Sequence, residues 1–165
     1  MGTLLHPKKG YMWTREEKAI IRTYSSHKKV SAFGSVNPLT GSNEVMQTSG
    51  RIDENKFIKF LNTLYGKFKG IVYFFLDSFR VHKSIKVFEW LESHPRMKFI
   101  FLPKYSPDLN VQEWLWNFSR KKFLNNRVFR SVRQLMPSFF WFIRRLDKPT
   151  IKRVCNIDIL LNRIT

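Results

Sequence analysis

Two apolar segments, separated by about one helix length, constrain the fold of this chain more than any other feature. The run IVYFFL occupies residues 71–76, and the run MKFIFL occupies residues 97–102. Each has the length of a strand, and a continuous apolar run is typical of a strand in a parallel sheet that is covered on both faces. A strand, a helix and a strand within about 30 residues form a βαβ unit. We therefore predict two parallel strands, each buried on both sides.

Sequence patterns predict one helix before the first of these strands and one after it. Asp53 is a good N-cap, and apolar residues recur at helical spacing after it. This stripe, which we expect to face the core, consists of Phe57, Phe60, Leu61, Leu64 and Phe68. Residues 83–93 are predicted to form the helix between the two strands, with Ile85, Phe88 and Leu91 pointing inward.

The remaining segments complete an α/β domain with a mixed sheet. Residues 29–38 and 42–50 alternate moderately on either side of a turn-rich stretch and predict a β-hairpin. Residues 111–124 predict a helix, and a last long helix carries Leu135, Phe139, Phe142, Ile143 and Leu146 on one stripe. Residues 1–27 and those after Pro149 show weak patterns. The length of 165 residues favours one domain.

The charge balance points to a polyanionic partner. Thirty Lys and Arg residues against twelve Asp and Glu residues give a formal net charge of +18. Such a charge attracts polyanions, so nucleic acid is the leading partner and an anionic membrane surface the second. No apolar run approaches the roughly 20 residues of a spanning helix. A single cysteine, Cys155, permits no internal disulfide and no cysteine-rich zinc site, which fits a reducing cytoplasm.

Only twelve residues are Asp or Glu, so the acids that lie next to apolar segments are candidates for a functional site. Asp77 directly follows the first apolar run, and ligands of open α/β sheets bind at the carboxyl ends of the strands. Asp is also common at the start of a turn, and the position alone favours neither interpretation. Asp108 lies in the turn sequence Ser-Pro-Asp-Leu, where turn chemistry is the better explanation.

Glu113 opens the helix that follows the loop LPKYSPDLN. Val111, Leu115 and Phe118 form the inward stripe of that helix, and Glu113 points away from it together with Trp116. The glutamate therefore faces either water or a cleft beside the sheet. A simpler explanation is that a carboxylate at a helix N-terminus is stabilised by up to about 1 kcal/mol.

Two carboxylates brought together from a strand end and a helix start would form a hard oxygen site. Mg²⁺ prefers such ligands and keeps several waters. Paired ions about 4 Å apart can activate a water or a 3′-hydroxyl and stabilise the leaving oxygen of a phosphodiester. A basic surface would hold the DNA backbone around that site.

The stretch FLDSFRVHKS, followed by LPKYSPDLNVQEWLW, resembles the C-terminal half of the catalytic domain of Tc/mariner-type bacterial insertion-sequence transposases. These belong to the DDE superfamily, which has an RNase H-like fold. The resemblance continues upstream through AFGSVNPLTG and the region around Gly10, Tyr11 and Trp13. It implies that Asp77 is the second catalytic acid, Glu113 the third, His82 the histidine and Trp116 the tryptophan of the family pattern.

The resemblance implies cut-and-paste DNA transposition with Mg²⁺ or Mn²⁺ bound by Asp77 and Glu113. His82 and Asn110 are expected near the site. Basic residues expected to contact DNA are Arg80, Lys83, Lys104, Arg120, Lys121 and Lys122. The expected partners are transposon ends and target DNA, with a second copy or an upstream-frame transposase product as protein partner. We expect a cytoplasmic, nucleoid-associated protein that does not contact a membrane.

This sequence departs from the family pattern in three places. Ser78 replaces the usual Asn after the second acid, and Val111 replaces the usual Pro. The first catalytic Asp of the family precedes the segment matched by LLHPKKGYMW, and no Asp occurs here before Asp53, the expected helix cap. We therefore expect a partial RNase H-like domain over residues 1–165. It would lack most or all of the first strand and the helix-turn-helix domain.

Two origins fit that expectation: a truncated or decayed transposase, and the downstream frame of an element that makes its enzyme by frameshifting. With two of three acids, the chain alone is expected to show weak or no cleavage.

The alternative function is a non-catalytic basic nucleic-acid-binding protein derived from a transposase. A nuclease or Holliday-junction resolvase of the same fold is a weaker alternative, since the Pro-Lys-Tyr-Ser-Pro signature argues against it. A membrane-surface protein is the least favoured, because the basic residues are spread along the chain.

Overall fold

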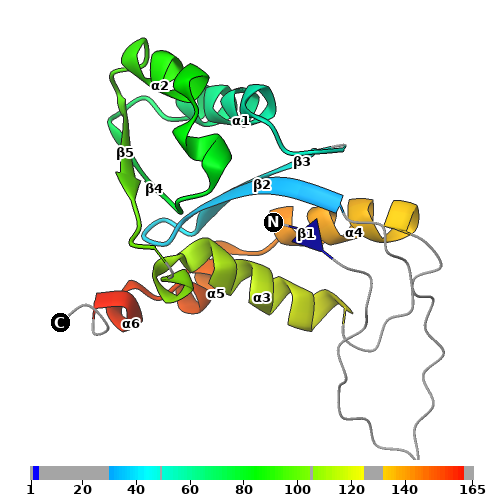
Figure 1. Ribbon diagram of the computed structural model, residues 1–165. Coiled ribbons are helices and arrows are strands. Elements are labelled where there is room, and N and C mark those ends of the chain that lie inside the picture. The colour runs from blue at the N-terminus through cyan, green and yellow to red at the C-terminus, as the bar shows by residue number, and fades with distance from the viewer. Residues whose placement is uncertain (1, 4–29, 49, 105, 125–131, 162–165) are drawn as a thin grey trace, which may run out of the picture.

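The computed structural model describes residues 2–3, 30–48, 50–104, 106–124 and 132–161, and its strands form two separate small sheets (Figure 1). The first sheet is antiparallel, in the order β1 (Gly2–Thr3), β2 (Val30–Asn37) and β3 (Ser42–Thr48). The second sheet consists of the parallel strands β4 (Val72–Leu76) and β5 (Met97–Phe101). The helices are α1 (Glu54–Lys67), α2 (Ile85–Glu92), α3 (Val111–Leu124), α4 (Val132–Arg144), α5 (Lys148–Val154) and α6 (Ile157–Leu161). Two short 3₁₀ turns, η1 (Arg80–Lys83) and η2 (Pro107–Leu109), precede α2 and α3.

The predicted β-hairpin is confirmed, and its turn has a clear physical basis. The Asn37 side-chain oxygen accepts hydrogen bonds from the main-chain N–H groups of Leu39 and Thr40, each at 3.0 Å. Gly41 follows with φ of +72°, and an added Cβ there would lie 2.5 Å from the Lys148 carbonyl oxygen. Glycine is therefore required at this position by both backbone conformation and the proximity of α5.

The predicted βαβ unit and the helix before it are confirmed as well. The Asp53 carboxylate accepts a hydrogen bond from the main-chain N–H of Lys56 at 2.9 Å and caps α1. Four of the five residues of its predicted stripe are buried, and the fifth, Phe68, is half-buried. β4 and β5 pair in parallel from Val72 opposite Met97 to Leu76 opposite Phe101.

Of the three residues predicted to point inward on α2, Leu91 packs against the core, but the prediction is wrong for Ile85 and Phe88. Ile85 is 78% exposed and Phe88 is 40% exposed, whereas Val87 and Trp90 are buried. The orientation is set by packing against α1, where the Trp90 indole N–H donates a 2.8 Å hydrogen bond to the Asn62 side chain. That contact lies 28 residues away in sequence and leaves no local periodic signal.

The prediction that both faces of the two apolar strands are buried is also wrong. The side chains of β4 that point toward α1 and α2 join the largest core cluster, but the opposite face is open. Ile71, Tyr73 and Phe75 are 64%, 63% and 59% exposed, and Ile100 on β5 is 39% exposed. Within the described residues, helices cover only one side of this sheet.

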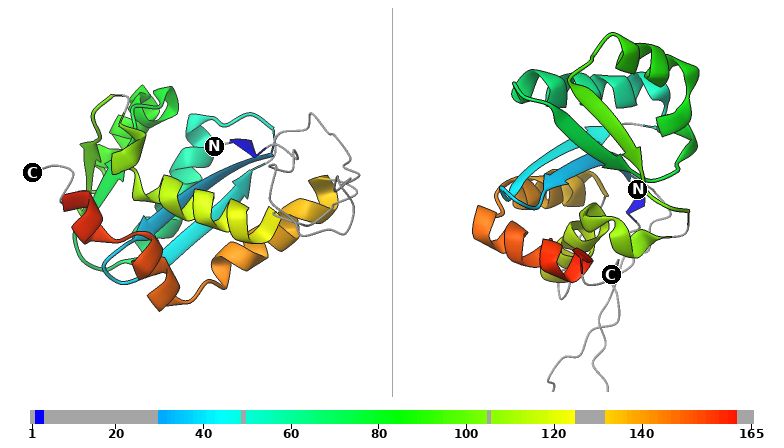
Figure 2. Two further views of the ribbon diagram at one scale, coloured as in Figure 1. Left: turned by 90° about the horizontal axis from the view of Figure 1, so that it is seen from below. Right: turned by 90° about the vertical axis from the view of Figure 1, so that its left-hand side faces the viewer.

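The other helices cover the opposite face of β2 and β3. Figure 2 shows α3, α4 and α5 on one side of these strands and α1 and α2 on the other. Trp116 of α3, predicted to point away from the core stripe, is buried and packs with Ala32 and Phe139. The correction follows from the position of α3, which contacts β2 and α4 at once and is buried on more than one side. No helix in the described part of the chain is long and apolar enough to cross a membrane.

Candidate functional site

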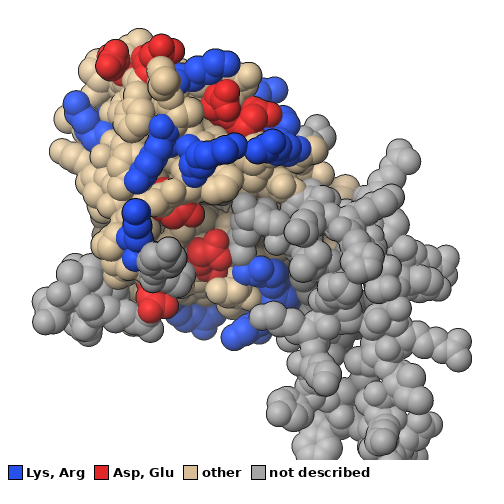
Figure 3. Space-filling model, viewed as in Figure 1, with Lys and Arg blue, Asp and Glu red and all other residues tan. Residues whose placement is uncertain are grey.

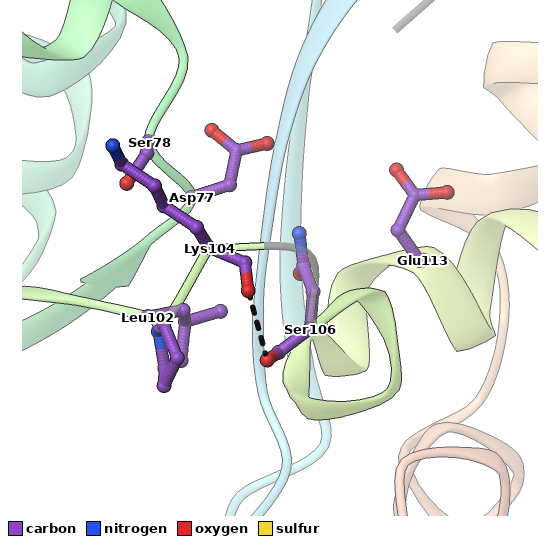
Figure 4. Close-up of a pocket in the computed structure, with 8 residues that line it drawn as sticks. Asp77, Ser78, Leu102, Lys104, Ser106 and Glu113 are labelled. Atoms are coloured by element: carbon purple, nitrogen blue, oxygen red, sulfur yellow. Dashed lines mark hydrogen bonds between the residues drawn. The ribbon is translucent and has the colours of Figure 1, made fainter.

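One surface pocket lies where the carboxyl ends of β4 and β5 meet the start of α3. Its lining consists of Asp77, Ser78, Leu102, Pro103, Lys104, Ser106, Asn110 and Glu113. Figure 4 shows Asp77 and Glu113 on two sides of this pocket, supplied by different elements. The structure thus brings together the two acids that the sequence singled out, along with Asn110 and Lys104.

Asp77 both begins a turn and lines the pocket, so the two interpretations of this residue are compatible. Its carboxylate accepts a hydrogen bond from the main-chain N–H of Phe79 at 3.1 Å. The Nδ1 atom of His82 lies 3.0 Å from the same Asp77 Oδ1. The hydrogen bond from His82 and the one from Phe79 hold the pKa of Asp77 below its ordinary value of 3.8, although burial opposes them. Asp77 is therefore ionised at neutral pH.

His82 lies behind Asp77 and does not line the pocket itself. Its side chain is only 14% exposed, and its ring packs 4.5 Å from the ring of Phe57 and 5.6 Å from that of Phe79. The Nδ1 atom also lies 3.2 Å from the main-chain oxygen of Asp77. Because its ring is held by packing, His82 fixes the orientation of the carboxylate that it contacts.

Glu113 lies in the first turn of α3 and lines the pocket. The sequence left open whether this side chain faces water or a cleft beside the sheet, and the structure shows that it faces the cleft. Its side chain is 33% exposed, and the nearest guanidinium nitrogen of Arg120 is 3.9 Å away. Burial raises the pKa of Glu113 above its ordinary value of 4.5, the positive charge of Arg120 opposes the rise, and the negative charge of Asp77 makes a smaller contribution in the same direction as burial.

This donor set fits a small hard cation. Mg²⁺ is commonly bound by one or two carboxylates and completes its shell with waters and substrate phosphates. A cation bound beside Glu113 would favour its ionised form and so oppose the burial that raises its pKa. No cluster of three or more His, Cys, Asp and Glu side chains suitable for a metal exists among the described residues. The pocket thus offers two protein carboxylates and leaves further positions to water or phosphate.

Basic side chains surround this pocket. Figure 3 shows acidic side chains near the middle of one face with Lys and Arg around them. Lys104 lines the pocket, and Arg120 lies beside Glu113. Lys83 donates a 3.2 Å hydrogen bond to the Ser78 hydroxyl and lies 4.8 Å from the centre of the Phe101 ring.

The other expected DNA contacts do not line the pocket. Arg80 is exposed on η1, and Lys121 and Lys122 are exposed near the end of α3. Sequence reasoning missed Ser106 as a pocket residue, although its hydroxyl donates a 3.4 Å hydrogen bond to the Lys104 carbonyl and stabilises the loop. Its position shortly after the second predicted strand, at the carboxyl end of the sheet, could have identified it as a pocket residue.

Comparisons with known proteins show the family of this chain. Residues 1–136 match a family model described as DDE superfamily endonuclease. The chain is 27% identical over 148 residues to the "Insertion element IS630 uncharacterized 39 kDa protein" of Shigella sonnei. That match covers 87% of this chain and 42% of the relative, so the chain spans less than half of the relative's length.

Two solved structures are similar in fold. The Mos1 transposase paired-end complex with left transposon end matches with a TM-score of 0.68 at 16% identity, covering 94% of this chain and 49% of that chain. The catalytic domain of Mos1 mariner transposase matches with a TM-score of 0.62 at 18% identity, covering 82% of this chain and 71% of that chain. These matches confirm the predicted RNase H-like α/β fold. The chain belongs to the DDE superfamily endonuclease family, as its resemblance to Tc/mariner-type transposases predicted.

Proposed function

We propose that this chain carries part of the DNA-cleaving and strand-transfer centre of a transposase, with Asp77 and Glu113 as ligands of Mg²⁺ or Mn²⁺. The observation that carries the proposal is the convergence of two carboxylates, one after β4 and one on α3, on a single pocket. Family membership supports the reaction class. Structures of the Mos1 transposase catalytic domain described "with Mg" and "with Mn" support the choice of cation.

Each side chain around the pocket has a separable role in this proposal. A bound cation would activate a water or a 3′-hydroxyl and stabilise the leaving oxygen of the phosphodiester. His82 holds the Asp77 carboxylate in one orientation through its hydrogen bond. Lys104 and Arg120 place positive charge beside the carboxylates, where a DNA phosphate would approach.

We further propose that this chain alone cleaves DNA weakly or not at all. Two-metal phosphoryl transfer in the family is expected to use three acids, and the described residues offer two at the pocket. Asp53 is not available as the third, because it caps α1. The alternative of a non-catalytic nucleic-acid-binding protein is favoured by the net charge of +18, which attracts DNA whether or not a cation binds.

The cation site is tested by titrating the full chain with Mn²⁺ and measuring free Mn²⁺ by electron paramagnetic resonance. We expect Asp77→Asn and Glu113→Gln each to weaken Mn²⁺ binding by at least tenfold. Glu92→Gln is the matched control, because Glu92 is an exposed acid on α2 outside the pocket. Binding that is equal in all three variants and the unmodified chain would contradict the proposal.

DNA chemistry is tested with a labelled duplex that carries a terminal repeat, in the presence of Mg²⁺. We expect binding without efficient cleavage, and robust cleavage by the chain alone would refute the expected inactivity. If the chain is instead a non-catalytic nucleic-acid-binding protein, it should bind DNA but not Mn²⁺. For phosphate contacts such as Lys121 and Lys122, each substitution by Ala is expected to lower the slope of log affinity against log salt by about 1.

A further inference from the structure

The short turn η1 contacts both residues that follow β4, each through a different side chain. His82 contacts the carboxylate of Asp77 at 3.0 Å. The next residue, Lys83, donates a 3.2 Å hydrogen bond from its ammonium group to the hydroxyl of Ser78. Ser78 lines the pocket beside Asp77. The ammonium group of Lys83 therefore lies at the edge of the pocket.

A second contact holds this ammonium group from the side of β5. It lies 4.8 Å from the centre of the Phe101 ring, within the range of a cation–π interaction. The Phe101 ring is itself packed, 6.3 Å from that of Phe99 on the same strand and 6.5 Å from that of Phe88 on α2. Lysine has a flexible four-carbon side chain, so contacts with two different elements are needed to restrict it. Lys83 has both contacts.

Neither contact neutralises the charge of Lys83. A hydroxyl and an aromatic ring are both uncharged, and Lys83 forms no ion pair with an acid among the described residues. Three lysines of α1 and α2 differ, because Lys56, Lys67 and Lys86 each lie 2.6–3.7 Å from a carboxylate oxygen. A cation that is held in place without a counter-charge attracts an anion to its own position.

The position of Lys83 also differs from that of Arg120 on α3. Arg120 lies 3.9 Å from the Glu113 carboxylate and donates a 2.8 Å hydrogen bond to the side chain of Asn117. Figure 4 shows Ser78 on the Asp77 side of the pocket, away from Glu113. Lys83 therefore supplies positive charge on the side of the pocket that Arg120 does not serve.

We propose that Lys83 forms a phosphate subsite on the Asp77 side of the pocket, and that Ser78 positions it. The ligand is a phosphodiester of the DNA backbone, so the inference rests on the proposed function for the identity of its ligand. An ammonium group has three donors and can bind a phosphate oxygen while it keeps its bond to the hydroxyl. Such a contact carries no sequence information and fixes the position of the backbone relative to Asp77. It does not require a bound cation.

The test measures DNA binding by the full chain with a labelled duplex, using fluorescence anisotropy at several salt concentrations with EDTA present. We expect Lys83→Met to weaken binding about fivefold and to lower the slope of log affinity against log salt by about 1. Lys59→Met is the matched control, because Lys59 is exposed on α1 and does not line the pocket. This control should weaken binding by less than about twofold, since it removes the same charge from a site without a phosphate contact.

A double-mutant cycle tests the role of Ser78. Ser78→Ala should weaken DNA binding about threefold in the unmodified chain and have no effect in Lys83→Met, because the hydroxyl acts through the ammonium group. Ser78→Thr keeps a hydroxyl and should bind DNA normally. Equal losses from Ser78→Ala in both backgrounds would contradict the positioning role.

Lysine acetylation, followed by mass spectrometry, reports the contact in the unmodified protein. Bound duplex should slow acetylation of Lys83 about fivefold and that of Lys59 by less than about twofold, because phosphate covers only the first. The inference is overturned if DNA binds but protects both lysines equally, or if Lys83→Met and Lys59→Met weaken binding equally. A failure to bind Mn²⁺ would contradict the proposed cation site and not this contact, whereas a chain that binds no DNA would overturn both proposals.

Discussion

Gly34 lies where α3 packs directly on β2, and a single methyl group at this position should measurably destabilise the fold. An added Cβ would be 2.7 Å from the Cζ2 atom of Trp116 and 2.9 Å from Gln112 Nε2. Both distances are shorter than ordinary van der Waals contacts, so α3 or the Trp116 ring must move. Trp116 is 5% exposed and its ring stacks 6.2 Å from that of Phe139, which leaves it little room.

Overpacking of this kind typically costs about 1–3 kcal/mol. For a domain of 150–250 residues, each kcal/mol lowers the melting temperature by about 2–4 °C. We therefore expect Gly34→Ala to lower the melting temperature by about 2–12 °C and to shift the urea midpoint downward with an unchanged slope. Because Glu113 adjoins Gln112 on α3, the displaced helix should weaken Mn²⁺ binding as well.

The matched control is Gly66→Ala, near the end of α1. No atom lies within 4 Å of a Cβ added at Gly66, so the substitution adds no contact. Alanine is better than glycine in a helix by up to about 1 kcal/mol, which gives the control the opposite sign. Urea unfolding followed by tryptophan fluorescence measures both variants. The packing of α3 on β2 is refuted if Gly34→Ala is neutral or stabilising.

Two further predictions concern the acids of the pocket. The folded chain keeps the proton of Glu113 at pH values just above 4.5, where the unfolded chain has lost it, so the contribution of this group to stability should fall as pH rises through that range. Glu113→Gln should abolish this pH dependence of stability in urea unfolding. The contribution of Asp77, whose pKa is lowered, is instead lost as pH falls below 3.8, so it does not mask the effect. A pH dependence that is unchanged in Glu113→Gln would contradict the role of burial. His82→Ala should weaken Mn²⁺ binding by about 10–100-fold, because partners that orient a metal ligand typically have effects of that size. His94→Ala, at a histidine that stacks on Trp90 at 3.9 Å and does not line the pocket, should bind Mn²⁺ normally.

The parts of the fold that sequence could predict are those encoded by neighbouring residues. The cap at Asp53 and the stripe of α1 are local patterns, and both are confirmed. The direction of Glu113 followed from its angle on α3 relative to Leu115 and was likewise correct. Trp116 failed the same reasoning because α3 packs against both β2 and α4, and a helix with two buried sides has no single inward stripe.

The sequence pointed to the acids of the site, but it did not predict which side chains contact them. A carboxylate that follows an apolar strand needs a partner or solvent, which made Asp77 a candidate, and the family resemblance then implied its role as the second acid. Its contact with His82 depends on how η1 turns and on the packing of the imidazole against Phe57, 25 positions earlier in the sequence. Pairing between distant segments sets such contacts, and local residue patterns do not report it.

The failed prediction for β4 carries information of its own. Exposed apolar residues that occur singly, such as Trp141, are normal on a protein surface and need no explanation. Tyr73 and Phe75 differ, because they alternate along β4 just after the exposed Ile71, and Ile100 of β5 is opposite Phe75. The same face also carries the exposed Lys98 opposite Tyr73, so it is apolar with one charged residue. The composition of β4 therefore fits the environment of a strand with neighbours on every side, and the described residues supply only some of those neighbours.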